Sequence, residues 1–123
     1  MDDVSVVVKT YDFARWLIPH LAKFSRDHRF TLGNRLEDGI LDVLECLVEA
    51  TYLREKRDLL RRANARLHRV RYLVRLATDF HLLSLKQYEF AATAIDEIGL
   101  ELGGWLKQQE RARGPREAPS ESV

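Results

Sequence analysis

The residues with the clearest capacity for chemistry are arginines concentrated between Arg54 and Arg75. This stretch holds nine of the chain's twenty Lys and Arg residues and two acids, so its formal net charge is +7, against +1 for the whole chain. A guanidinium pairs with phosphate through two hydrogen bonds and stacks on exposed bases. We therefore predict that this face binds nucleic acid or an acidic partner. On a helix one line joins Arg54, Arg57, Arg61, Asn64, His68, Arg71 and Arg75, and it is flanked by Arg62, Arg66 and Arg69.

A second interpretation makes the same arginines a solvated helix face that is balanced by acids. The preceding segment carries Asp38, Asp42, Glu45 and Glu49 at spacings of four, three and four, which place them on one side of a helix. Pairs between the two faces, within a chain or between subunits, would add little stability but could set register and partner choice. Eight arginines exceed four acids, so a surplus of positive charge remains after pairing.

Other candidates for chemistry are few, and we predict no enzyme activity, no cofactor and no metal site. The four histidines, His20, His28, His68 and His81, lie far apart, and none belongs to the Glu-x-x-His pair of a di-iron bundle. There is no phosphate-binding glycine loop and no Gly-x-Ser-x-Gly motif. The single Cys46 cannot form an internal disulfide, and we interpret it as a packed thiol. A metal-dependent bundle enzyme is the alternative that elemental analysis would test.

Four segments with helical periodicity must position these residues. Each has apolar residues every three or four positions, and helices of roughly 18 to 27 residues with short connections are typical of a four-helix bundle. The predicted core residues are Val4, Val7, Tyr11, Ala14, Leu17, Leu21 and Phe24; Leu32, Leu36, Ile40, Val43, Leu44, Leu47 and Val48; Leu60, Ala63, Leu67, Val70, Val74 and Ala77; and Tyr88, Ala91, Ile95, Ile98, Leu102 and Trp105.

Local signals mark where these segments begin and end. Pro19 should kink the first helix, and a loop is expected around "SRDHRF". Thr31 or Asn34 could cap the second helix, and Ser84 with Gln87 has the spacing of a capping box for the fourth. The sequence thus predicts an all-α, antiparallel up-down four-helix bundle, a single domain over residues 1–111 with a disordered tail at 112–123.

The chain shows no sign of a membrane or secretory protein. No run of about 18 apolar residues is present, so we expect no membrane contact. The N-terminus has two acids and lacks the basic region of a secretory signal. The lone cysteine fits a reducing compartment, and we predict a cytoplasmic protein.

The last helical segment contains glycines where helices rarely have them. Gly99 and Gly103 share a face, and each costs about 1 kcal/mol relative to alanine in a helix. We predict that they permit close helix packing, within the chain or between subunits, with Trp105 as an aromatic anchor beside them. The alternative is that the helix frays or ends near Gly103.

Three strings carry a resemblance to a known family: "HRFTLGNRLED", "LLSLKQYEFA" and "DEIGLELGGW". From about Tyr11 to Lys107 the chain resembles the accessory variability determinants (Avd) of diversity-generating retroelements. These are four-helix bundles related to proteins encoded in intervening sequences of ribosomal RNA genes. The intervening-sequence relatives end a small-residue stretch with Asn-Ile-Ala-Glu-Gly. This chain has "ILDVLECLVEATY" there, which places it with the retroelement proteins.

The resemblance implies a non-enzymatic accessory subunit. Such proteins look like homopentamers that bind the retroelement's reverse transcriptase and its template RNA and support mutagenic synthesis of complementary DNA. Some members are strongly basic overall whereas this chain is nearly neutral, which favours the polymerase, or RNA held jointly with it, as partner. The alternative is an oligomeric structural or protein-interaction bundle that does not bind nucleic acid.

Overall fold

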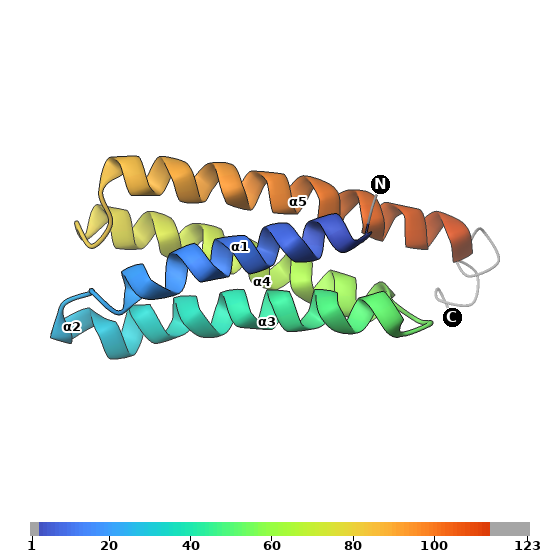
Figure 1. Cartoon of the computed structure of the whole chain (residues 1–123), viewed down its shortest axis with the longest axis horizontal. Helices are drawn as coiled ribbons and strands as arrows, with labels where there is room; N and C mark the ends of the chain where they lie inside the picture. The colour runs from blue at the N-terminus through green and yellow to red at the C-terminus, as the bar shows by residue number, and fades with distance from the viewer. Residues whose placement is uncertain (1–2, 114–123) are drawn as a thin grey trace, which may run out of the picture.

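The four periodic segments form four long helices in the computed structural model, which describes residues 3–113 (Figure 1). The long helices are α1 (Asp3–Leu21), α3 (Asn34–Tyr52), α4 (Arg57–Asp79) and α5 (Leu85–Arg113). Between α1 and α3 lie the short α2 (Arg26–His28) and a π-helix, η1 (Arg29–Gly33). Ala112 and Arg113 therefore belong to α5 rather than to the predicted tail, and the rest of that tail lies outside the described residues.

The long helices run antiparallel to their neighbours in the chain and close into a ring (Figure 1). Contacts join α1 to α3, α3 to α4, α4 to α5, and α5 back to α1. An ion pair between Lys9 Nζ and Glu101 Oε2, at 2.6 Å, spans the seam between α1 and α5. The prediction of a single-domain, all-α bundle is confirmed.

The core follows the predicted periodicity closely in α4 and less well in α1. All six predicted core residues of α4 are buried, and so are Leu36, Ile40, Val43 and Leu47 of α3. In α1 the predicted Tyr11 is exposed, and Thr10 is buried in its place. Thr10 Oγ1 donates a hydrogen bond to Val6 O at 2.8 Å, which satisfies the buried hydroxyl. The polar Thr10 in the core line explains why the prediction missed this position, whereas the predicted Ala14, Leu17, Leu21 and Phe24 are buried.

At other positions of α1 and α3 the apolar pattern predicted the wrong core residues. Val6 and Phe13 are buried in α1 although neither was predicted, and Val48 of α3 is exposed although it was. Cys46 and Ala50 complete the buried face of α3 instead. Positions 43, 46, 47 and 50 recur at helical spacing on one face, and Val48 lies outside that face.

Helix ends were predicted correctly at α5 and wrongly at α3. Ser84 N donates to Gln87 Oε1 at 2.8 Å and Gln87 N donates to Ser84 Oγ at 3.0 Å, so the capping box is confirmed. Thr31 and Asn34 cap nothing: their side chains donate to the carbonyls of His28 and Phe30. The expected loop is helical, and α3 continues directly from η1, so no free backbone N–H groups need a cap.

Pro19 lies in the last turn of α1, and the helix ends two residues beyond it. Because proline lacks an N–H group, one backbone hydrogen bond is missing just where the chain leaves the helix.

Candidate nucleic-acid and partner interface

Helix α4 carries most of the predicted arginine face, but two predicted residues, Arg54 and Arg57, do not lie on its exposed surface. The helix begins at Arg57, so Arg54 lies in the connection from α3 rather than on the predicted line. Arg57 is mostly buried, with its Nε 3.6 Å from Glu55 Oε1. In the same connection Lys56 Nζ donates to Ala50 O and Leu53 O, both at 2.6 Å. The connection therefore uses its cations to hold the end of α3, as carbonyls at a helix C-terminus favour.

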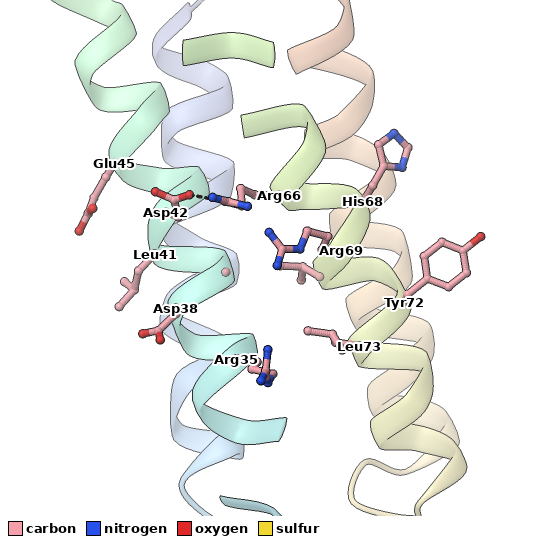
Figure 2. A pocket seen from close by; sticks show the side chains of 12 residues that line it. Arg35, Asp38, Leu41, Asp42, Glu45, Arg66, His68, Arg69, Tyr72 and Leu73 are labelled. Carbon is pink, nitrogen blue, oxygen red and sulfur yellow. Dashed lines mark hydrogen bonds and ion pairs between the residues drawn. The ribbon is translucent and has the colours of Figure 1, made fainter. Parts of the chain in front are cut away.

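The arginines on the α3 side of α4 converge on one carboxylate. Asp42 accepts hydrogen bonds from Arg62 Nε at 3.2 Å, from Arg62 Nη2 at 3.3 Å and from Arg66 Nε at 2.7 Å. Figure 2 shows the Arg66–Asp42 pair across the gap between the two helices. Burial alone would raise the pKa of Asp42, but the hydrogen bonds from Arg66 and Arg62 outweigh it and lower the pKa below its ordinary value of 3.8.

Two arginines on the α5 side of α4 pair with acids of α5. Arg61 Nη2 donates to Glu110 Oε2 at 2.9 Å, and Arg71 Nη1 donates to Asp96 Oδ1. The alternative interpretation, in which acids balance the arginines, therefore holds for these residues. The acids, however, belong to α5 and not to the predicted stripe of α3. In residues 5–112 only Asp42 of the predicted acidic stripe pairs with an α4 arginine, because the arginine line faces α5.

Three members of the predicted site have no such partner. His68, Arg69 and Arg75 are exposed, and within residues 5–112 none forms a hydrogen bond or ion pair. Figure 2 shows Arg69 pointing into the groove beside α3, whereas His68 and the exposed Tyr72 point away from it. The middle and C-terminal parts of α4 thus present positive charge that no described carboxylate balances.

A groove of about 760 Å³ separates α3 from α4 (Figure 2). Its apolar lining includes Leu41 and Leu73, and Arg35 adds another exposed cation. Gly39 lies in this groove, and a Cβ atom built on it would lie 2.8 Å from Val70 Cγ2. Real Cβ atoms do not approach so closely, so Gly39 is what allows α3 and α4 to pack this tightly. Sequence analysis missed it because a single glycine in a helix gives no sign of which neighbour approaches it.

The predicted glycines of α5 have different surroundings. Gly99 lines a smaller groove of about 300 Å³ between α4 and α5, and a Cβ there would make ordinary contacts with Leu67 and Arg71. Gly103 has open space where its Cβ would be. The helix runs on to Arg113, so the alternative that it ends near Gly103 is wrong. Packing of Gly103 against another subunit stays a prediction.

Trp105 is fully buried among the core residues of the bundle. It anchors packing within the chain, and its indole is not available to another subunit. Its Nε1 is buried without a hydrogen-bond partner among the described residues.

The described residues show no sign of a reactive thiol, a metal site or a membrane-spanning helix. Burial, together with the nearby Asp42 carboxylate, raises the pKa of the Cys46 thiol, which disfavours the nucleophilic thiolate. Among the described residues, no group of His, Cys, Asp and Glu is placed to hold a metal ion. No described helix is both long enough and apolar enough to cross a membrane.

Comparison with known families identifies the relationship. A family model described as bAvd-like matches residues 5–109, which span the bundle from α1 through most of α5. The chain belongs to the bAvd-like family. The predicted resemblance is thereby confirmed, and this Avd-type family is one of non-catalytic accessory proteins. A search of curated proteins found no match.

Proposed function

We propose that this bAvd-like chain is a non-catalytic accessory subunit of a diversity-generating retroelement. It assembles as a homopentamer and binds the element's reverse transcriptase and template RNA, and so supports mutagenic synthesis of complementary DNA. Family membership supports the role. The proposal of RNA binding rests on one observation: on the exposed surface of α4, His68, Arg69 and Arg75 have no carboxylate partner among the described residues.

The balance of charge along α4 supports a division of labour between its arginines. Four are engaged with acids, namely Arg61, Arg62, Arg66 and Arg71. The donors of Arg69 and Arg75 are free for phosphate, and the two residues lie about 9 Å apart along the axis at 1.5 Å per residue. The two positions also differ by about 120° around the axis, so an RNA backbone that contacts both would cross the outward face of α4 between them.

The experiment that tests this proposal is a salt series of RNA binding by fluorescence anisotropy, using the template RNA encoded beside the gene. The double variant Arg69→Gln/Arg75→Gln should bind more weakly and reduce the slope of log K against log salt by about 1.4, from about 0.7 per lost contact with a single strand. A slope equal to that of the unmodified protein would contradict the assignment.

Two controls separate a local contact from a general loss of charge. Arg15→Gln/Lys107→Gln removes the same charge from exposed positions on α1 and α5, and it should change the slope less. Arg71→Gln/Asp96→Asn removes one ion pair without changing net charge and should leave RNA affinity nearly unchanged. If all three double variants lost affinity equally, α4 would have no special role.

Light scattering at low and high salt tests the assembly. The proposal expects a salt-stable mass near five times 14.3 kDa that increases when template RNA is added at low salt. Co-purification with the reverse transcriptase encoded in the same element tests the other partner, and its absence from a salt-resistant complex would count against the accessory role.

A second candidate is an oligomeric protein-interaction bundle without nucleic-acid binding. The observation that favours it is an outer surface with large apolar residues, among them Tyr72 on α4 and Leu100 on α5, which is 80% exposed. Tyrosine and arginine together are typical of protein interfaces. An assembly that dissociates at high salt and gains no mass with RNA would support this candidate instead.

A further inference from the structure

One end of the bundle exposes aromatic rings that the proposed function has not used. The connection from α1 to α3 and the connection from α4 to α5 lie at this same end (Figure 1). Phe30 in the first is 61% exposed, and Phe80, which ends α4, is 50% exposed. Single exposed apolar residues need no explanation. Here, however, both rings contact a cationic or titratable neighbour, and the contact of Phe80 with His28 joins the two connections.

Two ring contacts lie at this end of the bundle. The His28 ring stacks on Phe80 with 5.3 Å between centroids and an interplanar angle of 27°. The Arg29 guanidinium lies 4.8 Å from the centroid of Phe30. Arg29 and Phe30 follow His28 directly in the chain, so both ring contacts lie at the same end of the bundle. We call these four residues the aromatic end.

Hydrogen bonds hold the backbone of the aromatic end while its rings stay accessible. Arg29 and Phe30 open the π-helix η1, a type of turn that is frequent at functional sites. Asn34 Nδ2 donates to Phe30 O at 3.1 Å, and Arg29 Nη1 donates to Ala22 O at 3.5 Å. These bonds order the chain before any ligand arrives, which lowers the entropy cost of binding.

On the α4 side, a left-handed residue fixes the position of Phe80. His81 has φ 62°, and the bonds His81 N to Thr78 O and Leu82 N to Ala77 O, both 2.9 Å, form a Schellman motif. A non-glycine residue there carries a conformational cost. The chain thus turns immediately after Phe80, and the ring stays at the rim beside His28.

Positive charge surrounds these rings. Lys23 and Arg26 are exposed and form no ion pair among the described residues, and Arg29 likewise has no carboxylate partner. The acids there are Asp27 in the first connection and Asp79, the last residue of α4, fewer than the three cations. Aromatic platforms next to free cations match the chemistry of unpaired nucleotides, which offer a π-face and a phosphate at every step. A protein partner would have to place acidic groups and aromatic rings at the same alternating positions as the phosphates and bases of such a strand.

We propose that the aromatic end binds unpaired bases of single-stranded RNA by stacking on Phe30 and Phe80, while Lys23 and Arg26 contact phosphate. The inference rests on the proposed RNA-binding function and adds a second contact to it, distinct from the α4 arginines. It predicts a preference for single-stranded over duplex RNA, because the bases of a duplex are not accessible for stacking.

The test compares binding of a 12-nucleotide oligoadenylate with binding of a fully paired RNA of equal length. Phe30→Leu and Phe80→Leu keep apolar bulk and remove the aromatic face, and both sites are surface positions whose folding circular dichroism can verify. Each variant should weaken single-strand binding roughly fivefold or more and leave duplex binding unchanged. The matched control is Tyr52→Leu at the opposite end of the bundle, a ring that is 71% exposed; it should have no effect.

Each other outcome overturns the inference. Unchanged single-strand binding by both phenylalanine variants, alongside a slope that still depends on Arg69 and Arg75, would reject the aromatic end but keep the proposed function. An unmodified protein that binds neither RNA would reject both. If the variants lost the reverse transcriptase and kept RNA, this end would be a protein interface.

Discussion

The two grooves that flank α4 are built with similar arginines but differ in size and in how those arginines are paired. On the α3 side one carboxylate, Asp42, holds two arginines beside a groove of about 760 Å³. On the α5 side Asp96 and Glu110 each hold one arginine beside a groove of about 300 Å³. The two sides therefore differ in how their arginines share carboxylates. Arg69 in the α3-side groove and Arg75 on the line that faces α5 have no such partner among the described residues.

The number of arginines on a helix therefore says little about their availability to a ligand. Whether a guanidinium can meet phosphate depends on the neighbouring helix, which supplies or withholds a carboxylate. The same neighbours also set the spacing of the helices, since Gly39 allows close approach on the α3 side and Gly99 faces an ordinary contact on the α5 side.

The largest expected difference between the grooves comes from their glycines. Gly39→Ala should lower the free energy of unfolding by about 1–2 kcal/mol, because its Cβ would press on the stiff Val70 side chain. Gly99→Ala should be neutral or stabilise by up to about 1 kcal/mol through helix propensity. Urea denaturation followed by circular dichroism measures both. Adding Val70→Ala should relieve part of the strain of Gly39→Ala, and an unstrained Gly39→Ala would refute the close approach.

A smaller difference is expected between the acids. Asp42→Asn should destabilise by about 1 kcal/mol, since it weakens hydrogen bonds from two arginines. Asp96→Asn should cost less than about 0.5 kcal/mol, because that pair is more exposed, with side-chain exposures of 65% for Asp96 and 23% for Asp42. Equal losses in the same denaturation experiment would mean that burial does not distinguish the two sides.

The smallest expected effect is on the pH dependence of stability. The folded pKa of Asp42 lies below its ordinary value of 3.8, so its contribution is present above that value and disappears as the pH falls through the folded pKa. Between pH 5 and pH 3, wild type should therefore lose slightly more stability than Asp42→Asn. Parallel curves for the two proteins would show that the carboxylate is not stabilised by its arginines.

The sequence predicted what periodicity can encode and missed what depends on neighbours. The core line of α4 was correct because apolar residues recur there without interruption. Thr10 hid the core line of α1, since a hydroxyl bonded to its own helix is compatible with burial. The interpretation that acids balance the arginines named α3, whereas Arg61 and Arg71 meet α5, because a helical wheel does not say which helix lies on which side.

The candidate site was predictable in composition but not in accessibility. The predicted set contained the accessible Arg69 and Arg75. It also contained Arg57, which is mostly buried, and Arg54, which lies before α4 begins. His28 and Phe80 are far apart in the sequence and stack only because the two connections share one end of the bundle. Distances of that kind come from the fold, and no local pattern signals them.

The closed ring of helices has a kinetic consequence. Three of its four contacts join helices that follow each other in the chain, so they close short loops, and folding dominated by such contacts is fast. The seam between α1 and α5 alone joins the two ends of the bundle, and its closure carries the largest loop entropy. We expect amide hydrogens along this seam to exchange earlier than those of the α3–α4 pair, with Lys9 and Glu101 at the part that opens first.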